Sequence, residues 1–182
     1  MDFSGGGQQR GRGTVVPSFT GEYTQRVDGK GRMSIPADFR RVLEAGDPTW
    51  SDGNSPKLKV VYGDHLIEVL HVYTMDAFND IAAAIQAMPR GNPNRRRLQR
   101  LFLGQSLTGE VDKDGRCVIP IKQREKIGLV DGEVFFSGAG EYFEIWKAET
   151  FARTEGRATA EWLKDMPQDF DPLVLLDQTQ GE

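Results

Sequence analysis

The spacing of hydrophobic and polar positions along the chain follows the same order twice. In the first round, apolar residues alternate with polar ones before Asp28 and then recur at helical intervals after Pro36. This round predicts strands over 19–27 and 32–35, a helix from 36, strands over 57–62 and 66–73, and a helix over 74–88. Thr74 is suited to cap the last helix, and Pro89 ends it.

The second round repeats this order in a shorter form. It predicts strands over 105–111 and 116–119, a helix over 120–127 that Gly128 ends, strands over 133–137 and 142–146, and a helix containing Phe151. The stretch 66–70 aligns with 142–146, because both carry a central glutamate, Glu68 or Glu144. Self-similarity on this scale predicts one supersecondary unit used twice.

Each unit contains the same turn between its first two strands. Residues 27–36 and 111–120 share Val, Asp, Gly, Arg, Ile and Pro at fixed offsets, and Arg40 matches Arg124 further along. Asp can accept local backbone N–H bonds and Gly tolerates positive φ, so these residue types are suited to holding a chain reversal. The predicted turn-holding residues are Asp28, Gly31, Asp112 and Gly115.

A long cation ends each turn. Arg32 and Arg116 leave tight hairpins, so each guanidinium can be placed rigidly, and a guanidinium can bind guanine O6 and N7 in the major groove. Lys30 is a candidate phosphate contact, but Asp114 stands at its place in the second turn. A purely structural Asp–Arg pair is the competing interpretation of each turn.

Charge is unevenly distributed along the 182 residues. The net charge of −4 argues against nucleic acid, yet residues 26–41 hold five bases and two acids. Residues 90–100 hold five arginines and no acid, whereas 149–182 hold eight acids and three bases. A basic region beside an acidic tail is compatible with nucleic-acid binding. No stretch approaches the roughly 18 apolar residues of a membrane span, and the first residues lack a secretory signal, which predicts a cytoplasmic protein.

Between the two rounds, a helical run begins at Asn92-Pro93. It carries several arginines, for which two interpretations are open: a second phosphate-binding patch, or a helix whose arginines pair with carboxylates within the subunit or across an oligomer. These arginines are Arg95, Arg96, Arg97 and Arg100.

The residues that catalysis commonly uses do not converge in the sequence. On a strand, His65 and His71 share one face while Glu68 points to the other, so no metal site is expected. The single cysteine, Cys117, excludes an internal disulfide and is expected to pack as a small apolar residue. The Gly138–Gly140 stretch joins two strands and lacks the following helix of a phosphate-binding loop. We therefore expect no enzyme and no cofactor.

On these motifs the chain resembles the MraZ family, tandem relatives of the AbrB-type (swapped-hairpin) DNA-binding proteins. The resemblance rests on the paired Asp-x-x-x-Arg turns, each followed by Ile-Pro, and on the arginine-rich junction over 92–104. It implies a mixed α+β fold, a pseudo-twofold double-split β-barrel with peripheral helices. It divides the chain into a disordered arm (1–18), a first SpoVT-AbrB-like repeat (19–88), a connecting helix (89–104), a second such repeat (105–165) and an acidic tail (166–182).

The resemblance also implies a function. Members are transcriptional regulators at the nucleoid, expected to repress their own division and cell-wall gene cluster by binding tandem short repeats upstream as ring-shaped homo-oligomers. Double-stranded DNA and further copies of the chain are thus the expected partners, with no membrane and no small-molecule substrate. The expected DNA contacts are Lys30, Arg32, Arg116, Arg26 and Arg40, with the first turn the stronger. An AbrB-like antitoxin, or a ring scaffold for a protein partner, is the alternative that the acidic tail keeps open.

Overall fold

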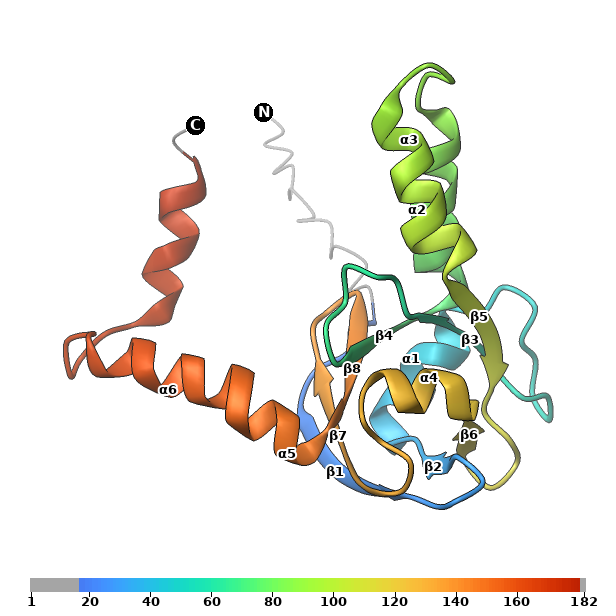
Figure 1. Cartoon of the computed structure of the whole chain (residues 1–182), viewed down its shortest axis with the longest axis horizontal. Helices are drawn as coiled ribbons and strands as arrows, with labels where there is room; N and C mark the ends of the chain where they lie inside the picture. The colour runs from blue at the N-terminus through green and yellow to red at the C-terminus, as the bar shows by residue number, and fades with distance from the viewer. Residues whose placement is uncertain (1–16, 181–182) are drawn as a thin grey trace, which may run out of the picture.

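The computed structural model describes residues 17–180, so the predicted disordered arm at 1–18 lies almost wholly outside the described residues. Within the described part, eight strands form one antiparallel sheet that curls into a nearly closed barrel (Figure 1). The strands are β1 Glu22–Val27, β2 Arg32–Ser34, β3 Lys57–Val61, β4 Val69–Tyr73, β5 Ser106–Glu110, β6 Arg116–Val118, β7 Gly132–Gly138 and β8 Tyr142–Lys147. The mixed α+β barrel expected from the sequence is confirmed.

Helices cover the barrel and project from it. The α-helices are α1 Ala37–Ala45, α2 Met75–Ala87, α3 Pro93–Leu98, α4 Ile121–Lys126, α5 Ala148–Phe151 and α6 Arg157–Lys164. Two π-helical segments, η1 Gln99–Gly104 and η2 Ala152–Gly156, continue α3 and join α5 to α6, and the 3₁₀ helix η3 Pro172–Gln180 lies in the predicted acidic tail. As predicted, Thr74 caps α2, since its Oγ1 accepts a 3.1 Å hydrogen bond from the N–H of Ala77. Within the described residues, no helix is long and apolar enough to cross a membrane.

The two halves of the chain exchange their first strands. The strand order is β5-β3-β4-β8-β7-β1-β2-β6, in which β1 pairs along its whole length with β7, and β3 pairs with β5. The predicted hairpin of β1 and β2 is therefore short, and its two strands pair only at Val27 and Met33. β1 and β5 each find their longest partner, β7 or β3, in the other half, so neither half can complete its sheet alone.

A pseudo-twofold axis relates the halves, and the strand register locates it. Met33 lies opposite Cys117 in the β2–β6 pair, and these two residues occupy the same place in the two motifs. His71 lies opposite Glu144 in the β4–β8 pair, and each stands three residues before its helix N-cap, Thr74 or Lys147. The axis passes through both pairs, because only there does a residue face its own counterpart.

One part of the predicted repeat is wrong. β4 begins at Val69, and the residues before it form a turn in which Glu68 has a φ of +57°. Counted from the helix N-caps, the counterpart of Glu144 is His71 rather than Glu68. The shared glutamate gave a local match that is three residues out of register with the helices that follow.

The barrel interior is filled mainly by aromatic and branched side chains. Phe143 is completely buried, and its ring centroid lies 5.1 Å from Phe19, 4.8 Å from Phe39 and 5.7 Å from Phe136. These rings come from the N-terminal end of the described chain, α1, β7 and β8, so one cluster joins both halves. Burial of large aromatic side chains is among the strongest contributions to a core.

Two helical arms leave the barrel in different directions. α2 and α3, with η1, form a hairpin that rises from one end of the barrel, whereas α5, η2 and α6 run out sideways and lead to η3 (Figure 1). The helices that contain Phe78 and Phe151 correspond at their N-terminal ends, as predicted, because each phenylalanine is the fourth residue of its helix. Within residues 17–180, only the first arm has a second helix packed along it, so the halves differ outside the barrel.

We predict that Phe143→Ala lowers the free energy of unfolding by about 3–5 kcal/mol, because it removes a buried ring and leaves a cavity between the halves. Urea denaturation followed by circular dichroism measures this. Val130→Ala, at a side chain that is 52% exposed, is the control and should change stability little. An equal loss in both variants would contradict a core shared by the two halves.

Candidate nucleic-acid interface

The carboxylate of Asp28 organises the first turn. Its Oδ1 accepts the N–H groups of Lys30 at 2.9 Å and Arg32 at 3.0 Å, and its Oδ2 accepts the Nε–H of Arg32 at 2.7 Å. The backbone adds bonds between Asp28 and Arg32 and between Gly31 and Asp28, at 3.1 and 2.8 Å. The same aspartate therefore both holds the turn and orients the arginine that ends it.

The second turn repeats this network. Asp112 Oδ1 accepts the N–H groups of Asp114 and Arg116, both at 2.9 Å, and its Oδ2 lies 3.3 Å from two nitrogens of the Arg116 guanidinium. The turn-holding assignments of the two aspartates agree with this geometry, and the glycines before each arginine have positive φ, +81° at Gly31 and +76° at Gly115.

Each turn is seated on the opposite half of the barrel. The carbonyl of Gly31 accepts the N–H of Ile119 at 3.0 Å, and the carbonyl of Gly115 accepts the N–H of Ile35 at 2.9 Å. A buried arginine supports the first turn: Arg124 donates to the carbonyls of Ile119 at 3.0 Å, Gly29 at 3.5 Å and Val130. Because the side chain of Arg124 lies beneath Gly31, a Cβ there would come within 2.8 Å of its Nε.

Arg40 occupies the corresponding place beneath the second turn. A Cβ on Gly115 would lie 2.6 Å from an Arg40 terminal nitrogen, and the Nε of Arg40 is buried without a hydrogen-bond partner among the described residues. Arg40 is thus half-buried against the turn, unlike the exposed Arg26 and Lys30. The structure gives Arg40 a supporting place in the fold, and contact with DNA stays a prediction for it.

The outer face of the β2–β6 ribbon is the surface that both turns present. Met33 and Cys117 point into the core, so their neighbours along each strand face outward. Ser34 lies opposite Arg116 and Arg32 opposite Val118 in this two-stranded antiparallel pair. Arg32 and Arg116 are diagonal neighbours on one face, a separation of about 7–8 Å between Cα atoms in such ladders.

A shallow concavity lies over this ribbon. Residues of β1 and β2, Arg116 and the start of β7 surround it: Arg26, Val27, Asp28, Gly29, Arg32, Ser34, Arg116, Asp131 and Gly132. Three of the predicted DNA contacts, Arg26, Arg32 and Arg116, thus share one surface, with Lys30 exposed on the turn beside it. The sequence did not single out Ser34, Val118 or Asp131, which only strand register brings to this face.

The two arginines differ in their charged neighbours. Among the described residues, Arg32 has one carboxylate partner, Asp28, which accepts its Nε–H. Arg116 has two, since Asp114 approaches its terminal nitrogen at 2.6 Å in addition to Asp112 at 3.3 Å. Asp114 stands where the first turn has Lys30. It therefore removes a positive charge from the second turn and also forms an ion pair with the Arg116 guanidinium.

Local hydrogen bonds keep both turn carboxylates ionised. The N–H of Arg32, followed by its guanidinium, holds the pKa of Asp28 below its usual range, and the N–H of Arg116 does the same for the pKa of Asp112. A carboxylate whose pKa is lower in the folded state than in the unfolded state stabilises the fold at any pH above the unfolded-state pKa. The contribution of Asp28 and Asp112 to the free energy of unfolding is therefore complete at neutral pH. It is lost only as the pH falls through the lowered values.

Both histidines pack against aromatic rings. His65 lies in a turn and stacks on Phe102 with ring centroids 5.1 Å apart, so the predicted strand position of His65 is wrong. His71 stacks on Tyr142 at 4.2 Å, and burial lowers its pKa to about 4, which keeps it neutral near pH 7. Over residues 17–180, no group of three or more His, Cys, Asp or Glu side chains is placed to hold a metal ion.

Fold and surface together define a class: tandem swapped-hairpin barrels that present a two-stranded, arginine-bearing ribbon. Comparison with known proteins agrees. The family model described as "MraZ protein, putative antitoxin-like" matches residues 18–101 and again 102–168. The chain belongs to the MraZ family.

Curated relatives cover nearly the whole chain. The transcriptional regulator MraZ of Ruegeria pomeroyi is 52% identical over 163 residues, 90% of this chain and 97% of the relative. The protein of the same name in Ruegeria sp. strain TM1040 is 50% identical over the same shares. That of Chromobacterium violaceum is 33% identical over 82% of this chain and 94% of its own.

We predict that Gly31→Ala is strongly destabilising and Gly29→Ala is not. An alanine at residue 31 has a φ of +81° and places Cβ 2.4 Å from the carbonyl oxygen of Ile119, whereas a Cβ at residue 29 meets nothing within 4 Å. The conformational cost alone is about 1–3 kcal/mol. Thermal unfolding of the two variants beside the parent chain measures the difference, and equal melting temperatures would contradict the proposed seating of the turn.

Proposed function

We propose that the chain is a sequence-specific DNA-binding transcriptional regulator that inserts the β2–β6 ribbon into the major groove. One observation carries this proposal: the ribbon's exposed face bears Arg32 and Arg116, each oriented by a turn aspartate. The major groove of B-DNA admits a two-stranded ribbon. The names of the relatives support the regulatory role.

Arg32 is the residue we assign to base recognition. Asp28 accepts a hydrogen bond from its Nε–H, and its terminal nitrogens bond no described residue. These nitrogens can therefore donate two parallel hydrogen bonds to guanine O6 and N7. Lys30 and Arg26 are exposed near it and supply phosphate contacts, which raise affinity without reading sequence. Arg116 makes the weaker contact, because Asp114 competes for its guanidinium.

A single ribbon spans few base pairs, so repetition supplies the affinity. We propose a ring-shaped homo-oligomer whose subunits bind tandem short repeats upstream of the chain's own operon, in a division and cell-wall gene cluster that it represses. When the repeats match the subunit spacing, each further contact forms at high effective concentration. Position at the nucleoid follows from such binding.

We predict that Arg32→Ala abolishes specific binding to the DNA upstream of the chain's own gene. Losing a bidentate guanine contact costs about 1–3 kcal/mol in each subunit, and repetition multiplies that loss. A mobility-shift titration at fixed salt, with unrelated DNA as competitor, measures it. Arg157→Ala is the matched control, since its Nε also binds a carboxylate four residues away, at 2.8 Å, but on α6. Full retention of specific binding by the Arg32 variant would refute the proposal.

We predict that Arg116→Ala weakens binding less than Arg32→Ala, and that Asp114→Lys strengthens it. The lysine removes a carboxylate from Arg116 and adds a phosphate contact, so the dependence of log affinity on log salt concentration steepens by about one charge. Fluorescence anisotropy across a salt series measures both effects. Asp52→Lys, in the exposed loop before β3, is the control for net charge. Equal losses for the two arginines would contradict the unequal roles of the turns.

A further inference from the structure

An apolar groove runs along the first helical arm, away from the β2–β6 ribbon. It lies between α2, the α3–η1 helix and the adjoining end of the barrel, and is lined by Tyr73, Ile81, Ala84, Ile85, Met88, Leu98, Phe102 and Glu141. All but one of these residues are apolar, which is unusual for a surface hollow unless something binds there. The acid, Glu141, belongs to the barrel and marks one end of the groove.

A basic hollow lies on α3 beside the groove. Arg95 stands three residues before Leu98 on α3 and therefore shares its face, and Arg90, Arg95 and Arg96 surround a neighbouring hollow. The Nε of Arg95 is buried without a hydrogen-bond partner among residues 17–180. Of the four junction arginines, Arg95, Arg96, Arg97 and Arg100, it is Arg100 that pairs with a carboxylate, Asp64, at 3.4 Å. The interpretation that these arginines pair within the subunit therefore holds only for part of the group.

The end of the chain has the complementary character. Residues 165–171 contain three aspartates and no base, and the 3₁₀ helix η3 that follows exposes large apolar side chains. Leu173 is 66% exposed, Val174 46% and Leu175 40%. Phe170 packs edge-on against Trp162 at 5.6 Å, which folds this segment back from the end of α6. The tail thus has an acidic stretch followed by apolar side chains. These are complementary to the basic hollow on α3 and the apolar groove beside it.

The arms keep the two surfaces of one chain apart. α6 carries η3 to the opposite side of the barrel from the α2–α3 hairpin (Figure 1). We propose that residues 169–175 of one copy dock into the groove of a second copy, with Asp169 and Asp171 toward Arg95 and Arg96 and the leucines along α2. The inference rests on the homo-oligomeric part of the proposed function and names the contact that builds the assembly.

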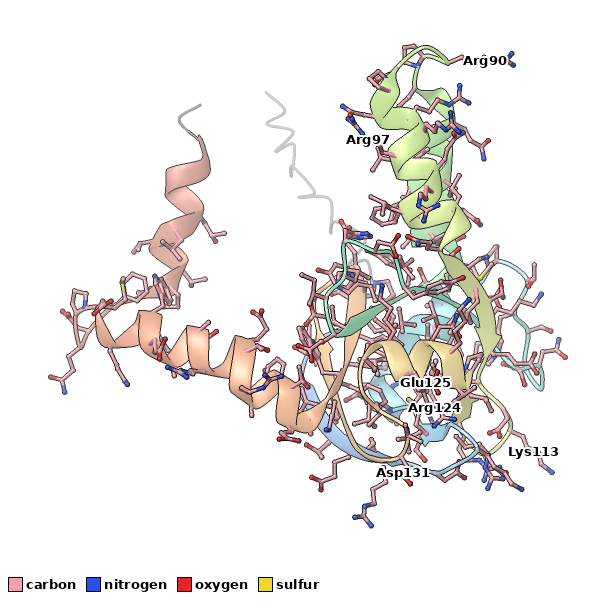
Figure 2. All side chains as sticks on the ribbon, viewed as in Figure 1. Arg90, Arg97, Lys113, Arg124, Glu125 and Asp131 are labelled. Carbon is pink, nitrogen blue, oxygen red and sulfur yellow. The ribbon has the colours of Figure 1, made fainter. Side chains whose placement is uncertain are left out.

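The position of the arginines favours a protein occupant over DNA. Arg90 and Arg97 lie toward the tip of the arm, whereas Lys113 of the second turn and Asp131 beside the ribbon lie at the far end of the barrel (Figure 2). A duplex on the β2–β6 ribbon therefore does not extend to the tip. The adjoining groove is apolar, which suits leucine side chains and not phosphates.

A disulfide between copies tests the docking directly. Ala84 lies in the groove, so a chain with Ala84→Cys is co-expressed with a differently tagged chain carrying Val174→Cys, and the purified assembly is treated with oxidised glutathione. We expect an interchain disulfide at least tenfold more abundant than with Ala83→Cys, an exposed neighbour outside the groove. The native Cys117 is buried and its pKa is raised to about 12, so it does not compete. Equal cross-linking at residues 83 and 84, or none at either, overturns the proposal.

Charge exchange provides a second test, with particle mass measured by light scattering in the absence of DNA. Asp169→Arg with Asp171→Arg, or Arg95→Asp with Arg96→Asp, should each reduce the assembly, and all four together should restore it. Restoration is decisive because Asp171 also accepts the N–H of Leu173, so its loss alone can disturb η3. Asp52→Arg is the control. An unchanged mass in every variant, or arginine variants that lose only DNA binding, overturns the docking, whereas failure of DNA binding with an intact assembly overturns only the proposed function.

Discussion

The reciprocal hydrogen bonds between each turn and the opposite half are the constraint on which this structure depends. The carbonyls of Gly31 and Gly115 accept the backbone N–H groups of Ile119 and Ile35, which directly follow β6 and β2, at 3.0 and 2.9 Å. With β1 paired to β7 and β3 to β5, neither unit has a complete sheet of its own. The two copies of the unit therefore form a single barrel.

This interlock also creates the surface that we assign to DNA. β2 and β6 are only three residues long and meet each other across the pseudo-twofold axis, so the ribbon exists only because the hairpins are exchanged. The turn aspartates fix the arginines at its two corners. The symmetry of the backbone does not extend to charge, because Asp114 gives the second corner two carboxylates where the first has one.

The helices outside the barrel break the symmetry more strongly. α2 is covered along one side by α3 and η1, while α5, η2 and α6 form an arm without a second helix along it. In the docking that we propose, the groove of one copy and the tail of the next make a head-to-tail contact rather than a closed pair. In these proposals the barrel contacts DNA and the arms build the assembly.

The sequence by itself determined the repeat, the turns and most of the elements. Asp28 and Asp112 were assignable to the turns because short polar side chains bond their own backbone, which is a local property. The glycines were assignable for the same reason. Local chemistry was a weaker guide at β4, where the shared glutamate placed the repeat three residues out of register and gave Glu68 and His65 strand positions that the structure does not have.

Only the tertiary structure decided which strands pair and which cations remain exposed. Arg40 and Arg124 occupy matching places in the sequence, within the predicted helices. Each nevertheless lies beneath the turn of the opposite half, and Arg124 is buried. Periodicity cannot show this, because exchange of strands between halves is a long-range choice. The local pattern specifies the hairpin, and the pairing across the axis decides what each arginine contacts.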